Sequence, residues 1–180
     1  MSKHKKNNNH HKYLNDLGIS STELCIFNTR ETDNGKETGR EKRFKKQREK
    51  YGFDERETWA MDYTLITWLY SHLKWYKNHA PINFEFHHFD IPVLEDIPED
   101  EIEWNEARTY APAFQKEVIK KDVSQKDAMK LALKYMKYFL KKEDDEEDDF
   151  KAAAEIETRR FECAKCSLKI VAELFPALWW

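Results

Sequence analysis

Apolar residues recur with the period of a helix in three stretches of the chain. These stretches begin near Asp54, at Ser124 and near Phe150, and each is long enough for several helical turns. A fourth stretch, residues 82–87, alternates apolar and polar residues with the period of a strand. Such periodicity is the main sequence signal of secondary structure. The pattern predicts a mainly α fold: a helical bundle-like domain with a minor extended or β element near 82–89.

The predicted strand needs a neighbour, because one short strand is not stable alone. It either pairs with another segment, for which residues 22–27 are the candidate, or lies extended across the helices. Residues 93–114 are acidic and interrupted by proline. They are therefore predicted to be a long connection with room for a short helix.

The later two helices have simple patterns. In the helix that begins at Ser124, one face is predicted to be buried. That face consists of Ala128, Leu131, Tyr135, Tyr138 and Phe139. In the last helix, apolar residues repeat every seven positions, as in a bundle seam. The seam consists of Ala154, Phe161, Leu168 and Phe175, with Ala164, Val171 and Leu178 beside it.

The first helix carries two apolar stripes on opposite sides. One consists of Trp59, Tyr63, Ile66, Tyr70 and Leu73. The other consists of Met61, Thr64, Trp68, His72, Trp75 and His79. An ordinary surface helix has one apolar face, so this helix is either buried centrally or meets a partner with its second face. We interpret Trp68 and Trp75, with the terminal Trp179 and Trp180, as interface residues of a homo-oligomer.

Acidic residues open the first helix. Asp54 as N-cap with Glu57 three residues later is a capping-box arrangement, and negative charge is favourable at this end of a helix. Asp62 lies two turns farther along, where aspartate has a poor helix propensity. It borders the first apolar stripe and therefore needs a partner from elsewhere in the fold. A structural salt bridge and a functional carboxylate both meet that need.

The composition supports helices and shows an uneven distribution of charge. The chain has 180 residues, of which 36% are charged, with only 4 glycines and 5 prolines to break helices. The net charge is −3, yet residues 36–50 hold eight Lys or Arg against three Glu. We predict a disordered basic arm over residues 1–50 and an α-helical domain over residues 51–180.

The basic arm has the residue types of a nucleic-acid contact. Arg43, Lys45 and Lys46 would hold phosphates while Phe44 stacks on a base. Two other interpretations are equally compatible with the sequence. The arm is a solvated lead-in to the first helix, or it pairs with the acidic run at residues 143–149.

The remaining sequence signals limit the cellular compartment in which the protein works. No apolar run approaches the roughly 20 residues of a membrane span, and the N-terminus has no apolar segment typical of a secretory signal. Three cysteines are too few for a disulfide framework. These features predict a soluble protein of a reducing compartment with no membrane partner.

Few residues carry recognisable chemistry. Cys163 and Cys166 form a C-x-x-C in helical sequence without a second pair for zinc, so they are predicted to be small core residues. His88 with Asp62 is a conceivable acid–base pair. Other residues of metal-binding type match no standard spacing: His72, His79, His87 and Asp90. Phosphate-loop and hydrolase motifs do not occur in the sequence, so no catalytic residue, metal or cofactor is predicted.

Three segments carry a resemblance to a known family: KKQREKYGFDERETWAMDYTLITWLYSHLKWYKNHAP, FHHFDIP and ELFPALWW. They resemble a widespread family of small, uncharacterised bacteriophage proteins, over residues 45–180. Thr58, Trp59, Asp62 and His88 occupy positions of the family signature, while Ala60 stands where a polar residue is also familiar. The resemblance implies a protein made in the cytoplasm of an infected bacterium, and it implies no established activity.

Three functions follow as hypotheses. The first is a non-enzymatic phage accessory protein, for counter-defence or host takeover, that self-associates and sequesters a host protein or a nucleotide-type signal. The second is a nucleic-acid-binding module that uses residues 36–50. The third is a metal-assisted hydrolase built on Asp62 and His88. The candidate ligand-binding residues are Trp59, Asp62, Tyr63, His88, Arg43, Lys45 and Lys46.

Overall fold

The computed structural model describes residues 17, 39–51, 54–80, 84, 86–103, 112–141 and 150–178. The chain divides into two compact units, Met1–Ser71 and His72–Trp180. This division lies inside a helix and differs from the predicted boundary at residues 50/51. Each unit is described by itself. The described part of the chain is mainly helical with one small antiparallel sheet, as the sequence predicts.

The first unit contains helices α2 (Gly39–Tyr51) and α3 (Arg56–Trp59) and the first half of α4 (Met61–His79). The basic segment thus forms a helix over residues 39–51. The helix predicted to run unbroken from Asp54 is instead interrupted at Ala60, where φ is −137° and ψ is 71°. Because of this break, Asp62 lies in the first turn of α4. Negative charge is favourable there, so the expected cost of an aspartate inside a helix does not arise.

Asp54 holds the start of α3 together. Its backbone N–H donates to Glu57 Oε1 at 3.3 Å, and its Oδ1 accepts from the backbone N–H of Arg56 at 3.1 Å. The Asp54 carboxylate is also fully buried and pairs in bidentate fashion with the Arg56 guanidinium, at 2.8 and 2.7 Å. The acidic start thus has a structural role, but the N-cap is Glu55 and not the predicted Asp54, and Glu55 makes no side-chain cap hydrogen bond.

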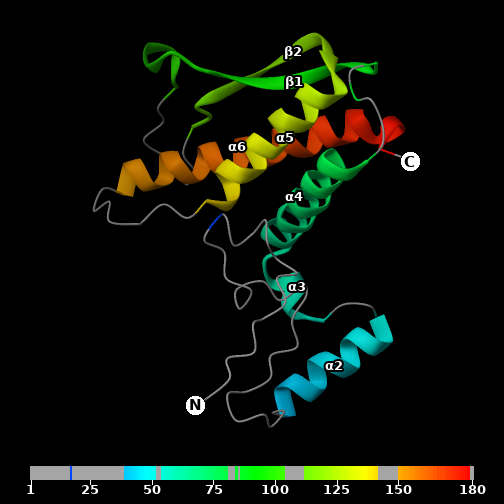
Figure 1. The fold of residues 1–180 in the computed structure, drawn as a ribbon. Helices are drawn as coiled ribbons and strands as arrows, with labels where there is room; N and C mark the ends of the chain where they lie inside the picture. The colour runs from blue at the N-terminus through cyan, green and yellow to red at the C-terminus, as the bar shows by residue number, and fades with distance from the viewer. Residues whose placement is uncertain are drawn as a thin grey trace, which may run out of the picture. The chain divides into compact units, whose positions relative to one another are not determined.

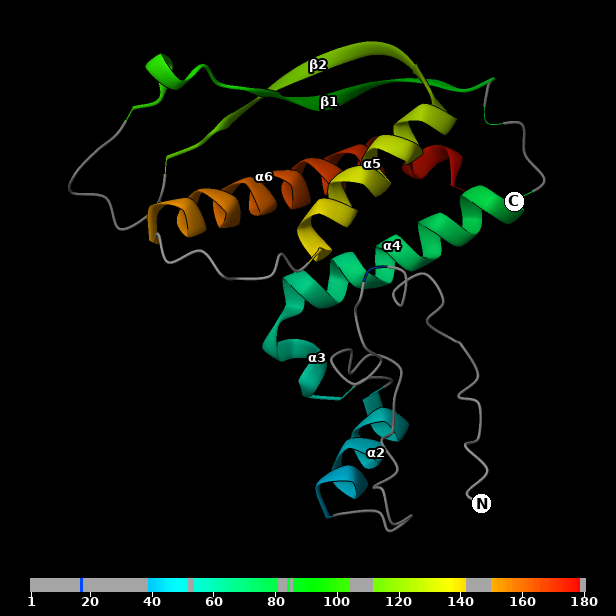
Figure 2. The same ribbon diagram turned by 60° about the vertical axis from the view of Figure 1, so that its left-hand side comes forward.

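The second unit contains a two-stranded antiparallel ribbon, β1 (His88–Asp96) and β2 (Gln115–Ser124), and helices α5 (Gln125–Leu140) and α6 (Phe150–Leu174). Figures 1 and 2 show the ribbon lying along one side of the two helices. Short 3-10 turns are η2 (Glu99–Glu101) and η3 (Phe175–Ala177). The predicted strand at 82–89 is thus displaced to 88–96, and its partner is β2; the candidate segment 22–27 lies outside the described residues.

The core of this unit lies between α5, α6 and β1. Fully buried apolar side chains are Ile91, Phe114, Ala128, Met129, Ala132, Met136, Leu140, Ile170 and Leu174. The predicted seven-residue seam of α6 is wrong in part, because Phe161 is 39% exposed and Phe175 is 71% exposed. The buried face of α6 instead follows Cys163, Cys166, Ile170 and Leu174. Spacings of three and four residues keep these side chains on one side of the helix.

Two contacts join the C-terminal turn to this core. Tyr76, on the last part of α4, donates its hydroxyl to the carbonyl of Ala177 at 3.2 Å, and Gln125 donates its amide to the same carbonyl at 3.0 Å. Burial raises the pKa of Tyr76. Among the described residues, no helix has the length and apolar character to cross a membrane.

Candidate anion-binding site

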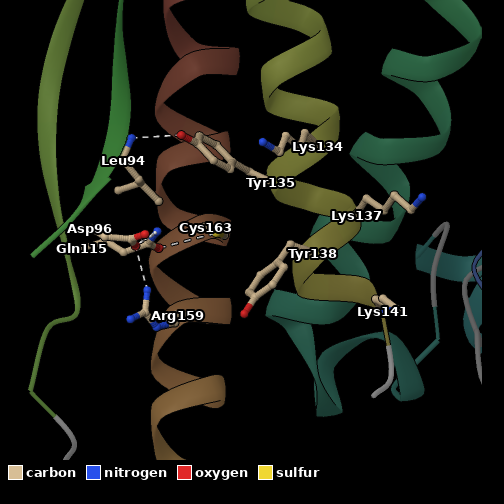
Figure 3. Close-up of a pocket in the computed structure, with 10 residues that line it drawn as sticks. All are labelled: Leu94, Asp96, Gln115, Lys134, Tyr135, Lys137, Tyr138, Lys141, Arg159 and Cys163. Atoms are coloured by element: carbon tan, nitrogen blue, oxygen red, sulfur yellow. Dashed lines mark hydrogen bonds and ion pairs between the residues drawn. The ribbon is translucent and has the colours of Figure 1, made fainter. Parts of the chain in front are cut away.

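A pocket of about 520 Å³ opens between the ribbon and helices α5 and α6. Figure 3 shows the side chains that line it: Leu94, Asp96, Gln115, Lys134, Tyr135, Lys137, Tyr138, Lys141, Arg159 and Cys163. Its volume lies in the range of pockets that hold small molecules, roughly 300–1,000 Å³. Four elements build it, β1, β2, α5 and α6, and each contributes at least one polar side chain.

The lining is strongly basic. Four of the ten lining side chains are Lys or Arg and one, Asp96, is a carboxylate. This excess of positive charge contrasts with the net charge of −3 of the whole chain. Basic side chains that converge on a concave surface raise the local concentration of anions. The pocket therefore favours an anionic ligand.

One wall of the pocket is held rigid by hydrogen bonds. The Tyr135 hydroxyl accepts from the backbone N–H of Leu94 at 2.9 Å, which fixes α5 to β1. Burial raises the pKa of Tyr135, so this hydroxyl stays protonated at neutral pH. Gln115 donates its amide to Asp96 Oδ1 at 3.0 Å. A wall that is ordered before binding lowers the entropy cost of holding a ligand.

Arg159 is the fixed cation of this wall. Its guanidinium donates to Asp96 at 2.8 Å and pairs with Glu155 one turn earlier at 3.1 Å. Desolvation lowers the pKa of Arg159, but the hydrogen bonds to Asp96 and Glu155 outweigh it and the pKa is raised overall. The guanidinium carbon also lies 5.2 Å from the ring centroid of Phe114. Arg159 is thus a permanent, oriented positive charge at the pocket.

Cys163 lines the pocket as a neutral thiol. Its Sγ lies 3.8 Å from Gln115 Oε1, and burial raises its pKa to about 11. Cys166, one turn later, donates to the carbonyl of Pro92 at 3.5 Å, and burial raises its pKa to about 12. Both are free, buried cysteines, so their prediction as small core residues is confirmed.

The lysines of the pocket belong to a longer stripe on α5. Lys126, Lys130, Lys134, Lys137 and Lys141 follow one another at intervals of three or four residues, so they share one side of the helix. Among the described residues, no ion pair involves Lys134, Lys137 or Lys141. In Figure 3 Lys134 reaches toward β1, whereas the ammonium group of Lys137 points away from the strands. Sequence reasoning missed this stripe, although its spacing is visible in the sequence.

Tyr138 supplies an aromatic surface at the pocket. The sequence pattern predicts it to be buried, but it is 37% exposed. Its ring lies between α5 and α6 on the side of Arg159 (Figure 3). An exposed tyrosine ring beside basic groups offers a stacking surface for a planar ring.

The basic residues predicted to bind ligand lie on α2. The Arg43 guanidinium pairs with the carboxylate of Glu55, and its carbon lies 5.5 Å from the ring centroid of the buried Phe44. Phe44 is therefore not available to stack on a base. Lys45 and Lys46 are exposed on the same helix. The pocket lined by α5 does not include these side chains.

The other predicted ligand residues of the first unit are Trp59, Asp62 and Tyr63. The Trp59 side chain lies outside the described part of the structure. Asp62 is exposed in the first turn of α4, so the burial that would have required a partner is not found. Tyr63 is half-buried on the same helix.

His88 has a carboxylate partner within its own ribbon. Its Nδ1 lies 2.9 Å from Asp122 Oδ1, and the backbone N–H of Asp122 donates to Asp90 Oδ1 at 3.0 Å. The partner is therefore Asp122, whereas the sequence pointed to Asp62. Within the described ranges, no group of three or more His, Cys, Asp or Glu is arranged to hold a metal ion.

The second apolar stripe of α4 is exposed. Met61 is 63% exposed, Trp68 42% and Trp75 44%, so the interpretation of a centrally buried helix is wrong for this face. Trp75 stacks on His79 with ring centroids 4.4 Å apart. The first stripe is buried at Ile66, Tyr70 and Leu73, as predicted. The terminal Trp179 and Trp180 lie outside the described residues.

Comparison of the chain with models of known protein families, with curated proteins and with solved structures gives no match.

Proposed function

We propose that this chain is a non-enzymatic binding protein that holds a small anionic ligand of nucleotide type between α5, α6 and the ribbon. The observation that carries the proposal is a pocket of about 520 Å³ whose lining brings Lys134, Lys141 and Arg159 together with the exposed ring of Tyr138. Lys134, Lys141 and Arg159 would contact the phosphates. Tyr138 would stack on the base.

The pocket suits a phosphate-bearing ligand more than a carboxylate of the same charge. Arg159 presents a planar guanidinium that is already oriented by Asp96 and Glu155. Such groups bind phosphate oxygens with directed hydrogen bonds. Lysines on the opposite side would add charge without fixed direction. An aromatic ring beside these cations completes the features by which proteins bind nucleotides without base-edge contacts.

The chemistry of the lining groups supports binding rather than catalysis. Cys163 has a pKa raised to about 11, so it is not a nucleophile at neutral pH. Asp96, the lining carboxylate, is engaged by Arg159 and Gln115. A general base must be free to take a proton from the substrate.

The resemblance to small bacteriophage proteins gives this binding role a setting. A phage protein that sequesters a nucleotide-type signal of its host would act in counter-defence or host takeover. High affinity and slow release serve such a role, and turnover is not needed. The ligand would then be a signal made by the infected bacterium.

Isothermal titration with adenosine triphosphate and with inorganic triphosphate tests the proposal. We expect Tyr138→Ala to weaken nucleotide binding about tenfold, because stacking contributes roughly 1–3 kcal/mol per base. Tyr138→Phe should leave it unchanged, since the ring is retained. Binding of inorganic triphosphate should not respond to either substitution.

A second pair of variants locates the phosphate contacts. Lys134→Gln/Lys141→Gln should weaken the binding of both adenosine triphosphate and inorganic triphosphate. The matched change of charge on α2 is Lys45→Gln/Lys46→Gln, and it should weaken the binding of neither. No measurable binding of nucleotide to the unmodified protein would contradict the proposal. Equal losses from the two double variants would contradict the placement of the site.

A second function, self-association, is favoured by the exposed stripe of α4. Five members of the stripe, together with the exposed Leu65 beside it, repeat at intervals of four and three residues: Met61, Leu65, Trp68, His72, Trp75 and His79. This is the spacing of a two-helix seam. We propose that the occupant of this face is α4 of a second copy in antiparallel orientation. In that orientation the dipoles of the two helices would oppose favourably.

Light scattering on the unmodified protein and on Trp68→Ala/Trp75→Ala tests this function. We expect a dimer that becomes a monomer in the variant. Ile119→Ala removes an apolar side chain that is 59% exposed on β2, and this control should leave the dimer intact. A monomer at micromolar concentration in the unmodified protein would refute self-association.

A further inference from the structure

A second hollow lies beside the first along α5. It has a volume of about 280 Å³ and is lined by Ile91, Lys120, Val123, Asp127, Lys130, Leu131 and Lys134. Lys134 lines both hollows. The lysines of the two hollows follow one another along this helix at intervals of three or four positions, which keeps them on one side of it: Lys130, Lys134, Lys137 and Lys141. The two hollows therefore follow one another along the same face of α5.

An irregularity in the ribbon brings Lys120 to this hollow. The strand register shifts between Phe89 and Ile91, so that one extra residue is accommodated in β2. Asp122 lies there with a φ of 57°, and its backbone N–H and side chain are held by Asp90 and His88. Lys120 pairs directly with the buried Ile91, and directly paired residues share a face of the sheet. In a regular strand, residues 120 and 123 would point to opposite faces, but both line the hollow.

The charges of the second hollow resemble those of the first. Asp127 is engaged by Lys130 at 2.8 Å and by the Ser124 hydroxyl at 3.1 Å. The hydrogen bond from Lys130 lowers the pKa of Asp127. This internal pair leaves Lys120 and Lys134 as the cations that flank the hollow. Ile91, Val123 and Leu131 supply an apolar floor that would accept a sugar or a base.

The length of the combined site exceeds that of one nucleotide's phosphate group. Lys130 and Lys141, the outermost lysines of the two hollows, are eleven residues apart. A helix rises 1.5 Å per residue, so they lie about 16 Å apart. Three separate cationic positions follow this line: Lys120 at one end, Lys134 in the middle, and Arg159 with Lys141 at the other end.

We infer that the ligand of this protein is a short linear oligonucleotide, with one phosphodiester at Lys134, a terminal nucleotide in the pocket of Tyr138 and the preceding nucleotide in the hollow of Lys120. This inference rests on the proposed nucleotide-binding function and names the ligand class for the same site. The repeated phosphates of an oligonucleotide match cations spaced along α5, and its bases match the apolar floor and the tyrosine ring.

Fluorescence competition tests the inference with three ligands: adenosine monophosphate, the adenosine dinucleotide and the adenosine tetranucleotide. We expect the dinucleotide and tetranucleotide to bind about tenfold more tightly than the mononucleotide, because a second nucleotide adds its own contacts. Lys120→Gln should remove most of this gain and leave mononucleotide binding unchanged. Lys116→Gln, on the same strand but in neither hollow, is the matched control and should change nothing.

The possible outcomes distinguish the oligonucleotide inference from the proposed nucleotide binding. Equal affinities for all three lengths, or a Lys120→Gln variant that keeps the full gain, would overturn the oligonucleotide inference while leaving nucleotide binding in place. Binding of none of the three ligands would overturn the proposed function and this inference together. An inorganic polyphosphate of equal charge that binds as tightly as the tetranucleotide would show that phosphate alone is recognised, and would overturn the inference too.

Discussion

Helices α2 and α5 both carry a dense set of basic residues, but they differ in what those residues contact. On α2, the Arg43 guanidinium pairs with Glu55, and Arg40 and Arg43 both lie 5.5 Å from the ring of Phe44. Arg56 approaches the same ring to 4.1 Å. These arginines are part of the packing of the first unit, and they stabilise the junction of α2 with α3.

On α5 the basic residues surround two hollows. The apolar side of this helix is buried, and its lysines lie on the opposite, exposed side, where several of them line the hollows. The comparison teaches that the density of positive charge in a sequence does not locate an anion site. Concave geometry decides it: Lys134 and Lys141 border a hollow, whereas the arginines beside Phe44 pack against its ring.

The largest expected effect concerns the buried ion pair of Asp54 and Arg56 in the first unit. Asp54→Ala should lower the free energy of unfolding of the first unit by about 3 kcal/mol, because it leaves the Arg56 guanidinium partly buried without its bidentate partner. Hydrogen exchange at the amides of α2 and α3 measures this loss. Asp62→Ala is the control, since that carboxylate is exposed and should contribute about 0.5 kcal/mol through the helix dipole. Similar losses of stability in the two variants would contradict the structural role of the ion pair of Asp54 and Arg56.

The next effect separates the two basic helices by salt dependence. Lys134→Glu/Lys141→Glu should weaken tetranucleotide binding and reduce the slope of log K against log salt by about 1.4, which is about 0.7 for each lost phosphate contact. Titrations at several salt concentrations measure the slope. The same substitutions at Lys45 and Lys46 should leave the slope unchanged. If the slope responded to the α2 variant instead, the anion site would lie on α2 and not on α5.

A smaller effect is expected at the start of α5. The Ser124 hydroxyl accepts from the backbone N–H of Asp127 at 3.2 Å, as an N-cap. Ser124→Ala should therefore reduce stability by about 1 kcal/mol, which urea denaturation would show as a lower midpoint. Ser71→Ala is a matched control, because that hydroxyl donates to the carbonyl of Thr67 inside α4, and alanine is favourable there. Equal shifts would show that the cap does not position α5.

The smallest expected effect is that of a pH change between 7 and 9 on stability and on ligand binding. The pKa of Cys163 is raised to about 11 and that of Cys166 to about 12, from an ordinary value of 9.0. Because the pKa is higher in the folded state, the stability that these thiols contribute is fully present below pH 9 and is lost as the pH rises through 11 and 12.

Ligand binding should accordingly show no thiolate step between pH 7 and 9. Alkylation by iodoacetamide, mapped by mass spectrometry, should leave Cys163 and Cys166 unmodified in the folded protein and modify both in urea. Rapid modification of Cys163 at pH 7.5 in the folded protein would contradict its burial beside the pocket.

Local patterns in the sequence predict much of the helical structure correctly. The start of α5 at Ser124, the start of α6 at Phe150 and the buried face of the first stripe of α4 follow from capping and periodicity. These features depend on residues within a few positions of one another. The burial of both helical cysteines was predictable for the same reason.

Contacts between distant segments decided the rest. The pairing of β1 with β2, the register shift at Asp122 and the pocket that joins Leu94, Lys134 and Arg159 all bring together residues far apart in the chain. A residue such as Tyr138 reads as core in a helical pattern, and only the position of α6 leaves its ring partly exposed. The sequence by itself determined where α5 and α6 begin and which residues of the first stripe of α4 are buried, because these depend on local interactions. The tertiary structure alone decided which basic surface is concave, because a hollow forms only where separate elements meet.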